Sequence, residues 1–212
     1  MNEGKFIVVE GISGSGKGTQ LQYLAKYLFE RYKYSEVLLT REPTGSSYGQ
    51  EARTLMQAHR QAGEDPTLHA HHYLDLFLKD RVYHFSHTIL PALEKGIQVV
   101  CDRYALTTMA LQQGPSLSVE DIIKKHQQRT IRVPDLTLLF DLPAEEALSR
   151  IQQAGRAEKG VHETRERLST ARKNYLQLSS LLPKYNITVV NAHNSPEEIF
   201  KCYRPALEVL FP

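Results

Sequence analysis

Residues 6–20 read FIVVEGISGSGKGTQ, and this stretch decides the fold. Its first five residues, Phe6 to Glu10, form a short run typical of a strand buried on both faces. A glycine-rich loop with the spacing G-x-x-x-x-G-K follows, and residues 20–32 then carry helical periodicity. Glycines at these positions let successive backbone N–H groups turn toward one anion, which the helix N-terminus also attracts. The stretch therefore predicts a strand, a phosphate-binding loop and a helix, in that order.

The loop supplies a set of consecutive candidate nucleotide-binding residues: Gly11, Ile12, Ser13, Gly14, Ser15, Gly16, Lys17, Gly18 and Thr19. Lys17 is expected to reach the outer phosphates. Gly18 follows it where the commonest form of this loop has a hydroxyl that binds magnesium. We therefore expect Mg²⁺ to be held mainly by phosphate oxygens and water, with Thr19 and Asp102 as protein ligands. The alternative is a tight turn with a solvated lysine.

Four more apolar runs follow along the chain and predict further buried strands: Val37 to Thr40, Ile97 to Cys101, Leu136 to Asp141 and Ile187 to Val190. Stretches with helical patterns separate them, at residues 74–93, 118–129, 143–153, 165–181 and 196–210. Strands that alternate with helices form parallel sheets through right-handed crossovers. The expected fold is the three-layer α/β P-loop NTPase fold, with five parallel strands, helices on both faces and a short basic lid.

Composition limits the kinds of function. The chain has 212 residues, 41% hydrophobic and 24% charged, without a repeat, so we expect a single domain over residues 1–212. A formal net charge of +2 is too small for a protein that coats nucleic acid or an anionic membrane. Cys101 and Cys202 lack the spacing of a metal site or a disulfide scaffold. With no long apolar run and no secretion signal, we expect a cytoplasmic protein without nucleic-acid or membrane partners.

Charged residues follow two expected strands at the point where each strand ends. Asp102 and Arg103 come directly after Cys101, and Arg41 comes directly after Thr40. The carboxyl ends of parallel strands meet at the edge where open α/β sheets bind ligands. Two guanidinium groups there suit a second phosphate, because their planar donors match phosphate oxygens. The alternative is a pair of surface ion pairs.

Five stretches, in this order and spacing, together resemble the thymidylate kinase family: FIVVEGISGSGKGTQ (6–20), LLTREPTGSSYGQEAR (38–53), LDLFLKDRVYHFSHTILPALEKG (74–96), VVCDRYALTTMALQQ (99–113) and PDLTLLFDLPAEEALSRI (134–151). The family phosphorylates dTMP with ATP. The resemblance implies that Lys17 and the loop amides hold ATP, that Arg103 and Arg41 hold the dTMP phosphate, and that Asp102 organises Mg²⁺. It also implies a homodimer that pairs through helices beside the sheet.

The resemblance further implies which residues bind the acceptor. Phe77 and Arg81 lie four residues apart and therefore project from one helix face. The matching pair in the family stacks on thymine and donates to its exocyclic oxygen. The alternative for Phe77 is a place in the core. The expected acceptor-binding residues are Ser13, Arg41, Phe77, Arg81, Arg103, Thr107, Thr108 and Gln112.

Basic residues gather after Arg150, and the family has its mobile lid at the corresponding place, here about residues 154–166. Phosphoryl transfer spreads negative charge over the moving group, so a cation beyond Lys17 is expected. The resemblance implies that the lid supplies it, with Arg150 and Arg156 as the leading catalytic candidates and Arg165 as the third. The alternative is a solvated, salt-bridged helix.

Three positions depart from the family pattern. Ser13 replaces an acidic residue that contacts the acceptor sugar, and Leu111 replaces an aromatic residue that crowds the 2′ side of the sugar. Thr44 stands where many relatives have glycine, in the loop that faces the acceptor. We therefore expect an ATP-dependent thymidylate kinase, and acceptor selectivity is the part of this expectation that the three departures affect. The alternatives are a kinase for another pyrimidine nucleotide or small acceptor, and a nucleotide-binding regulatory or interaction protein without turnover.

Three histidines, His69, His71 and His72, cluster before the long helix. A metal site there needs a carboxylate, and Asp75 is the one found nearby in the sequence. We therefore expect surface or interface histidines.

Overall fold

The computed structural model describes residues 3–31, 36–64, 66–155 and 163–211. Its centre is a parallel sheet with the strand order β2-β3-β1-β4-β5. The strands are β1 (Phe6–Glu10), β2 (Val37–Arg41), β3 (Gln98–Asp102), β4 (Leu136–Asp141) and β5 (Ile187–Asn191). The predicted five-stranded parallel sheet is confirmed, with strand ends shifted by one residue in three strands. Central strands β1 and β4 are almost fully buried because helices cover both faces, whereas edge strands β2 and β5 are partly exposed.

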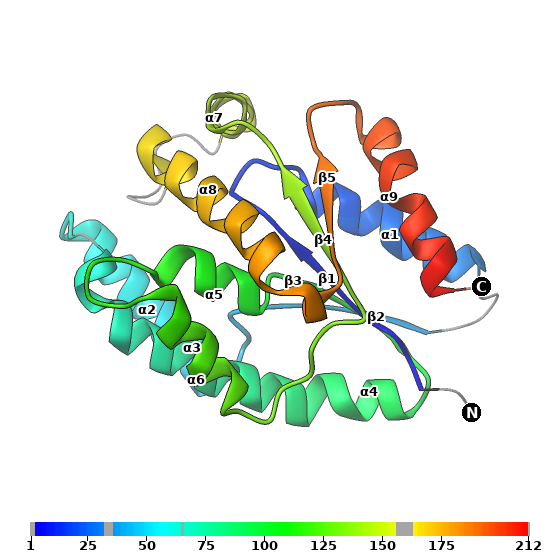
Figure 1. Cartoon of the computed structure of the whole chain (residues 1–212), viewed down its shortest axis with the longest axis horizontal. Helices are drawn as coiled ribbons and strands as arrows, with labels where there is room; N and C mark the ends of the chain where they lie inside the picture. Colours follow the sequence, from blue (N-terminus) through cyan, green and yellow to red (C-terminus); the bar gives the residue numbers. More distant parts are fainter. Residues whose placement is uncertain (1–2, 32–35, 65, 156–162, 212) are drawn as a thin grey trace.

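Helices cover both faces of this sheet, so the molecule has three layers (Figure 1). Helices α1 and α9 pack together on one face, and α8, α5 and α3 lie on the other. The α-helices are α1 (Lys17–Arg31), α2 (Ser47–Gln61), α3 (Ala70–His84), α4 (Leu90–Glu94), α5 (Ala105–Gln112), α6 (Val119–Gln127), α7 (Ala144–Gln153), α8 (Arg165–Leu181) and α9 (Pro196–Leu210), with the short 3₁₀ helices η1 (Pro66–His69) and η4 (Pro183–Tyr185). The predicted three-layer P-loop fold is confirmed.

The long helix expected at residues 74–93 is continuous but not uniform. A π-helical turn over Phe85–Ile89 joins α3 to α4. The turn ends two residues before Pro91, whose ring would clash with the carbonyl of His87 in a regular α-helix, so the wider turn accommodates the proline.

The sequence does not predict helix α2, because its apolar residues are few and, among its residues whose burial is described, only Gly49 and Ala52 are buried. Its start carries a local signal, since the Ser46 hydroxyl accepts a hydrogen bond from the Gly49 N–H at 3.1 Å. Among the described residues, no helix has the length and apolar content needed to cross a membrane.

Candidate functional site

The glycine loop joins the end of β1 to the start of α1, and its backbone conformation demands glycine. Gly11 and Gly14 have φ angles of 134° and 80°, in the region that side chains avoid. A Cβ at Gly11 would lie 2.5 Å from the carbonyl oxygen of Phe140, and one at Gly14 would lie 2.4 Å from that of Ala147. The loop therefore packs directly against β4 and α7, which fix its backbone conformation.

Lys17 is buried in the first turn of α1 and folds back over this loop. Its Nζ donates hydrogen bonds to the carbonyl oxygens of Gly11 at 2.9 Å and Ile12 at 2.7 Å. Burial, and then the nearby charge of Arg103, lower the lysine pKa well below its usual range. A polyphosphate beside Lys17 would supply negative charge that favours the ammonium form, so this lysine is suited to bind one.

The turn after β3 brings Arg103 to the same loop. Arg103 has a φ of 68°, which is rare for a residue with a side chain. The carboxylate of buried Glu10 stabilises the segment that follows, accepting hydrogen bonds from the N–H groups of Tyr104 at 2.8 Å and Thr107 at 3.2 Å. From this turn, Nη1 of Arg103 donates to the Gly11 carbonyl oxygen at 3.2 Å. The guanidinium therefore lies against the phosphate loop.

All the predicted acceptor-binding residues line one cavity of about 240 Å³. These residues come from the glycine loop, the ends of β2 and β3, α3 and α5, and they are Ser13, Arg41, Phe77, Arg81, Arg103, Thr107, Thr108 and Gln112. We name it the first cavity. The sequence thus identified side chains spread over 100 positions that the fold gathers at one edge of the sheet.

Arg81 forms the buried floor of the first cavity. Its Nε and Nη2 donate to Oε2 of Glu42, and Nη2 also donates to the Thr108 hydroxyl at 3.1 Å. Its guanidinium carbon lies 4.8 Å from the ring centroid of Tyr104. Four of the five guanidinium N–H groups are needed for its hydrogen bonds with described residues, counting one to His126. One N–H of Nη1 remains for a ligand in the cavity.

His126 of α6 fixes the fourth of these bonds. Nη1 of Arg81 lies 2.6 Å from Nε2 of His126, and Nδ1 of the histidine lies 2.8 Å from the Ile122 carbonyl oxygen. Because a guanidinium only donates, Nε2 accepts and Nδ1 carries the proton. Burial, reinforced by the charge of Arg81, lowers the pKa of His126 to about 3. This neutral imidazole therefore orients Arg81.

Thr107 lines the first cavity with its hydroxyl already engaged. Its Oγ1 donates to Oε2 of Glu10 at 2.5 Å and lies 2.8 Å from the hydroxyl of Tyr175. Nη1 of Arg103 approaches the same oxygen at 3.4 Å. Thr107 thus supports Arg103 and the turn. Phe77 also lines the first cavity, and its half-buried ring stacks on that of Tyr73 with the ring centroids 6.1 Å apart.

Thr44, a departure from the family pattern, ties the loop after β2 to α3. Its N–H donates to Oδ2 of Asp80 at 2.8 Å, and its hydroxyl donates to Oδ1 at 2.5 Å. Asp80 is buried and precedes Arg81, so these adjacent residues of α3 hold the two ends of the segment Glu42–Thr44. The threonine hydroxyl adds a bond that glycine lacks.

The expected lid arginines occupy different environments. Nη1 of Arg150 lies 3.9 Å from the position that a Cβ would take at Gly16, and its Nη2 donates to the His193 carbonyl oxygen at 3.0 Å. Arg165 is exposed, and its Nε and Nη2 bond Oε1 of Glu145. Arg156 lies outside the described residues, as does the central part of the expected lid. Arg150 is therefore the arginine of this group that the structure places beside the phosphate loop.

Three buried oxygens in the site lack hydrogen-bond partners among the described residues: Oδ1 of Asp102 and the hydroxyl groups of Ser15 and Tyr104. An unpartnered carboxylate oxygen at the end of β3 fits a hydrated hard cation, which accepts oxygen ligands and retains waters. Thr19, the other expected metal ligand, is exposed on the first turn of α1. Asp102 is thus the better placed of the two.

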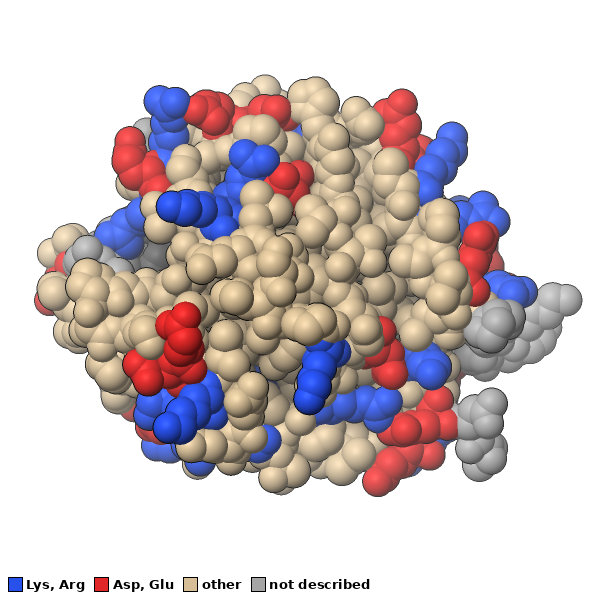
Figure 2. Space-filling model, in the orientation of Figure 1, with Lys and Arg blue, Asp and Glu red and all other residues tan. Residues whose placement is uncertain are grey.

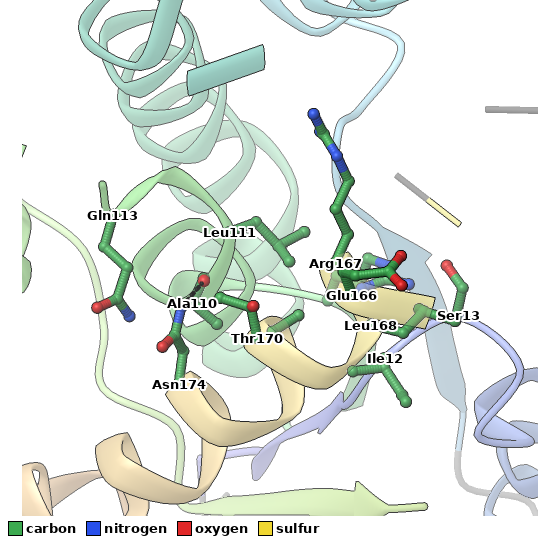
Figure 3. Close-up of a pocket in the computed structure, with 12 residues that line it drawn as sticks. Ile12, Ser13, Ala110, Leu111, Gln113, Glu166, Arg167, Leu168, Thr170 and Asn174 are labelled. Atoms are coloured by element: carbon green, nitrogen blue, oxygen red, sulfur yellow. Dashed lines mark hydrogen bonds between the residues drawn. The ribbon is translucent and has the colours of Figure 1, made fainter. Parts of the chain in front are cut away.

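A second cavity of about 250 Å³ adjoins the first, because both are lined by Ser13, Arg103 and Leu111. Figure 3 shows Leu111 from α5 and Ser13 from the glycine loop above the N-terminal turns of α8. Glu166 and Arg167 of α8 complete its charged lining. Ser13 and Leu111 therefore lie at the passage between the two cavities.

Basic and acidic side chains are interspersed over the face of the molecule shown in Figure 2. They gather toward its edges, and no continuous basic stripe crosses this face in the part of the chain that is drawn in colour. The basic chemistry of the site is accordingly local, as the small net charge predicts.

Three supporting residues were not among the predicted site residues: Glu10, Glu42 and His126. Glu10 had a visible signal, since it is a carboxylate at the end of an otherwise apolar strand. His126 also had one, because it falls in step with Val119 and Ile122 on the buried side of α6. Their partners lie 39 to 97 positions away and depend on how the helices pack.

Of the three histidines expected at the surface or an interface, His69 ends η1, and His71 and His72 lie in the first turn of α3. His71 and His72 are exposed, and Asp75, the carboxylate found nearby in the sequence, pairs with Lys79 at 2.6 Å. The carboxylate near His69 is instead Glu64, at 2.8 Å, because the end of α2 turns back toward α3.

Comparisons with known proteins agree with this geometry. The family model for thymidylate kinase matches residues 9–202. The chain is 38% identical over 202 residues to the thymidylate kinase of Carboxydothermus hydrogenoformans, covering 93% of each protein. It is 33% identical over 213 residues to that of Ruthia magnifica, covering 99% of this chain and 100% of the relative. The crystal structure of thymidylate kinase from Ehrlichia chaffeensis superposes with a TM-score of 0.72 at 26% identity, covering 97% of this chain and 99% of that one.

Proposed function

This chain belongs to the thymidylate kinase family, and from that premise we propose how its site residues carry out the reaction. The protein is an ATP-dependent nucleoside monophosphate kinase that phosphorylates dTMP. The observation that carries the residue assignments is the meeting of all eight acceptor candidates in the first cavity, which adjoins the phosphate loop at Ser13 and Arg103.

The donor phosphates of ATP lie in the glycine loop. Lys17 leaves its two loop carbonyls and bonds the outer phosphates, while the loop N–H groups and the start of α1 hold the rest. Arg103 sits between this loop and the first cavity and Arg41 lies at the end of β2, so together they hold the acceptor phosphate facing the donor. Positioning and charge stabilisation account for this catalysis, and no protein nucleophile takes part.

The thymine ring lies against Phe77 in the first cavity. The free N–H on Nη1 of Arg81 donates to an exocyclic oxygen of the base, while Glu42, Thr108 and His126 hold the guanidinium in place. Gln112 adds a polar contact from α5. Thymine is thus recognised by a fixed donor whose orientation is set before the ligand arrives.

The metal is Mg²⁺. It would lie near Oδ1 of Asp102, with nucleotide oxygens and water completing its coordination, and when bound it neutralises charge on the phosphates. Ser15 offers a second buried oxygen in the loop. Asp102 is the residue of this chain that orients the metal and its waters.

Arg150 supplies the additional cation on the donor side, next to Gly16. It shares this role with Arg156 in a basic lid at residues 154–166. Together they place positive charge on the transferring phosphoryl group and exclude water from it.

The whole chain, residues 1–212, works as a single kinase domain built on one sheet, and it pairs with a second copy as a homodimer. Its location is the cytoplasm. Free thiols at buried Cys101 and exposed Cys202 fit a reducing compartment. Its partners are nucleotides, not nucleic acid.

The test is a panel of nucleoside monophosphates with Mg²⁺ and ATP, followed by chromatography of the diphosphate products. We expect the highest kcat/KM with dTMP.

A second candidate acceptor is another pyrimidine nucleotide, favoured by Ser13 and Leu111 at the sugar side of the first cavity. A higher kcat/KM for UMP, dUMP or dCMP selects that candidate. ATP binding without any diphosphate product contradicts both and indicates a regulatory protein. Lys17→Ala controls for contaminating kinases.

A further inference from the structure

A cluster of two histidines and one glutamate lies outside the catalytic site, where the end of α2 meets the start of α3. It consists of His59, Glu64 and His69, whose potential ligand atoms all lie within 4.8 Å of one another. All three side chains are partly buried, with 18%, 43% and 35% of their surface exposed. An ion could therefore reach the cluster from solvent and keep one or more waters.

The backbone builds this cluster. Helix α2 ends at Gln61, and Gly63, two residues later, has a φ of 69°. The N–H of Glu64 donates to the carbonyl oxygen of His59 at 2.9 Å. A bond across five residues next to a left-handed glycine is the Schellman helix end. It holds Glu64 beside the last turn of α2, and η1 then places His69 above His59, with ring centroids 3.8 Å apart.

The distances suit a small coordinated ion. Oε2 of Glu64 lies 2.8 Å from Nε2 of His69 and 3.9 Å from Nε2 of His59. Ligands about 2.0–2.1 Å from a tetrahedral Zn²⁺ lie about 3.3 Å from one another, midway between these two values. Small rotations of the side chains would therefore place the three ligand atoms around one ion.

A partner outside the cluster orients one ligand. Nδ1 of His59 lies 2.7 Å from the hydroxyl of Tyr73, a buried residue of α3. A histidine that binds metal through Nε2 has its other nitrogen protonated and hydrogen-bonded to such a partner. Two imidazoles and one carboxylate favour Zn²⁺ over Mg²⁺, which prefers oxygen ligands.

We propose that His59, Glu64 and His69 bind a Zn²⁺ ion, with water in the remaining position and Tyr73 orienting His59. The ion links the end of α2 to the start of α3. Tyr73 stacks on Phe77, so the site is one residue removed from the lining of the first cavity. It is distinct from the Mg²⁺ position near Asp102, which lies at the sheet edge.

The test uses the full-length, untagged and metal-free protein titrated with Co²⁺, a spectroscopic probe for Zn²⁺ sites. We expect one equivalent to bind, with the visible absorption bands of tetrahedral Co²⁺, and Zn²⁺ to displace it. Loss of a residue that hydrogen-bonds a metal ligand typically lowers metal affinity by roughly 10- to 100-fold. Glu64→Gln and His69→Gln remove ligands themselves, so each should lower the Co²⁺ affinity by at least as much. Tyr73→Phe should weaken it within that range.

His72→Gln is the matched control, because His72 is an exposed histidine three residues along the chain from His69. It should retain the affinity and the spectrum, and circular dichroism should show that each variant is folded. The proposal is overturned if the unaltered protein binds no Co²⁺ at equimolar concentration. It is equally overturned if Glu64→Gln and His69→Gln bind as tightly as the unaltered chain.

Discussion

Arg81 donates two hydrogen bonds to one carboxylate oxygen of Glu42, from Nε at 2.9 Å and from Nη2 at 2.7 Å. The second oxygen of this carboxylate lies 3.0 Å from Nδ1 of His84. Both members of the pair are more than 90% buried. A buried charge without its partner is costly, so the pair links the end of β2 to α3 and fixes the arginine that we propose faces the base.

Replacing Glu42 with glutamine should show how much the ion pair with Arg81 contributes to the free energy of unfolding. Glu42→Gln keeps the shape and one acceptor oxygen, but it turns the other oxygen into an NH2 donor and leaves the charge of Arg81 buried without its carboxylate partner. We expect the free energy of unfolding to fall by about 3–5 kcal/mol, as measured by urea denaturation. The KM for dTMP should rise as well, because Arg81 loses its fixed orientation.

The control is Glu145→Gln, which removes the carboxylate of an exposed pair with Arg165. Solvent screens such pairs, so this change should leave the urea midpoint nearly unchanged. Equal effects of the two substitutions would contradict a special role for the buried pair.

His126 should make stability depend on pH in a defined range. Its pKa is lowered from 6.5 to about 3 by burial and by Arg81, so the unfolded chain binds the proton more readily. Stability from this group is therefore fully present above pH 6.5 and is lost as the pH falls toward 3. The loss is at most about 1.4 kcal/mol for each pH unit.

His126→Gln offers Arg81 an amide oxygen and removes the titrating group. The difference in unfolding free energy between the unaltered protein and this variant should therefore shrink steadily from pH 7 to pH 5. A difference that stays constant over this interval would show that His126 is not held neutral.

The fold was largely accessible from the sequence because its strands are short apolar runs and the longest helix has a clear period. Helix α2 was not, since most of its described side chains are exposed or partly exposed, and it packs through Ala52 and the close approach of Gly49 to Thr44. A Cβ at Gly49 would lie 2.3 Å from the Thr44 carbonyl oxygen. Such contacts depend on tertiary packing, which local patterns do not contain.

The acceptor candidates that line the first cavity could be picked out from the sequence, whereas the residues that orient them could not. Arg41, Arg81 and Arg103 stand out through their place at strand ends or on a helix face. Glu42 and His126 act on Arg81 from 39 and 45 positions away, and each has an ordinary alternative as an ion pair or a core residue. The direction of Arg81 is set by those two contacts.

Lys17→Ala should abolish most of the activity while the chain remains folded. The lysine Nζ is the group that we propose reaches the phosphates, and loss of one positioned donor costs at least about 100-fold in kcat. Two carbonyls lose a buried donor, which costs about 1–3 kcal/mol of stability and leaves a cooperative fold. The measurement is coupled ADP release together with circular dichroism. Near-normal ADP release would contradict the assignment.

Replacement of Arg150 and replacement of Arg165 should have different effects on kcat. Arg150 lies beside Gly16, and catalytic arginines in phosphoryl transfer contribute about 10³-fold or more to the rate, so Arg150→Ala should lower kcat strongly. Arg165 bonds Glu145 on the surface, and Arg165→Ala should change kcat little. Single-turnover measurements with saturating ATP and dTMP distinguish an effect on the chemical step from one on binding. The reverse order would move the catalytic role to the start of α8.

Leu111 should control discrimination between ribose and deoxyribose acceptors. It is 38% exposed and lines both cavities beside Ser13, where an aromatic ring would occupy more of the space next to the sugar. Leu111→Phe should therefore lower kcat/KM for UMP relative to dUMP, by about 10-fold or more, because a steric contact in such a pocket contributes about 1–3 kcal/mol. Gln113→Ala, which changes a residue that lines the second cavity, is the control and should leave the ratio unchanged. Both acceptors share the same base, so contacts with Phe77 and Arg81 cancel in the ratio of the two kcat/KM values. If Leu111→Phe left this ratio unchanged, the sugar would lie away from α5.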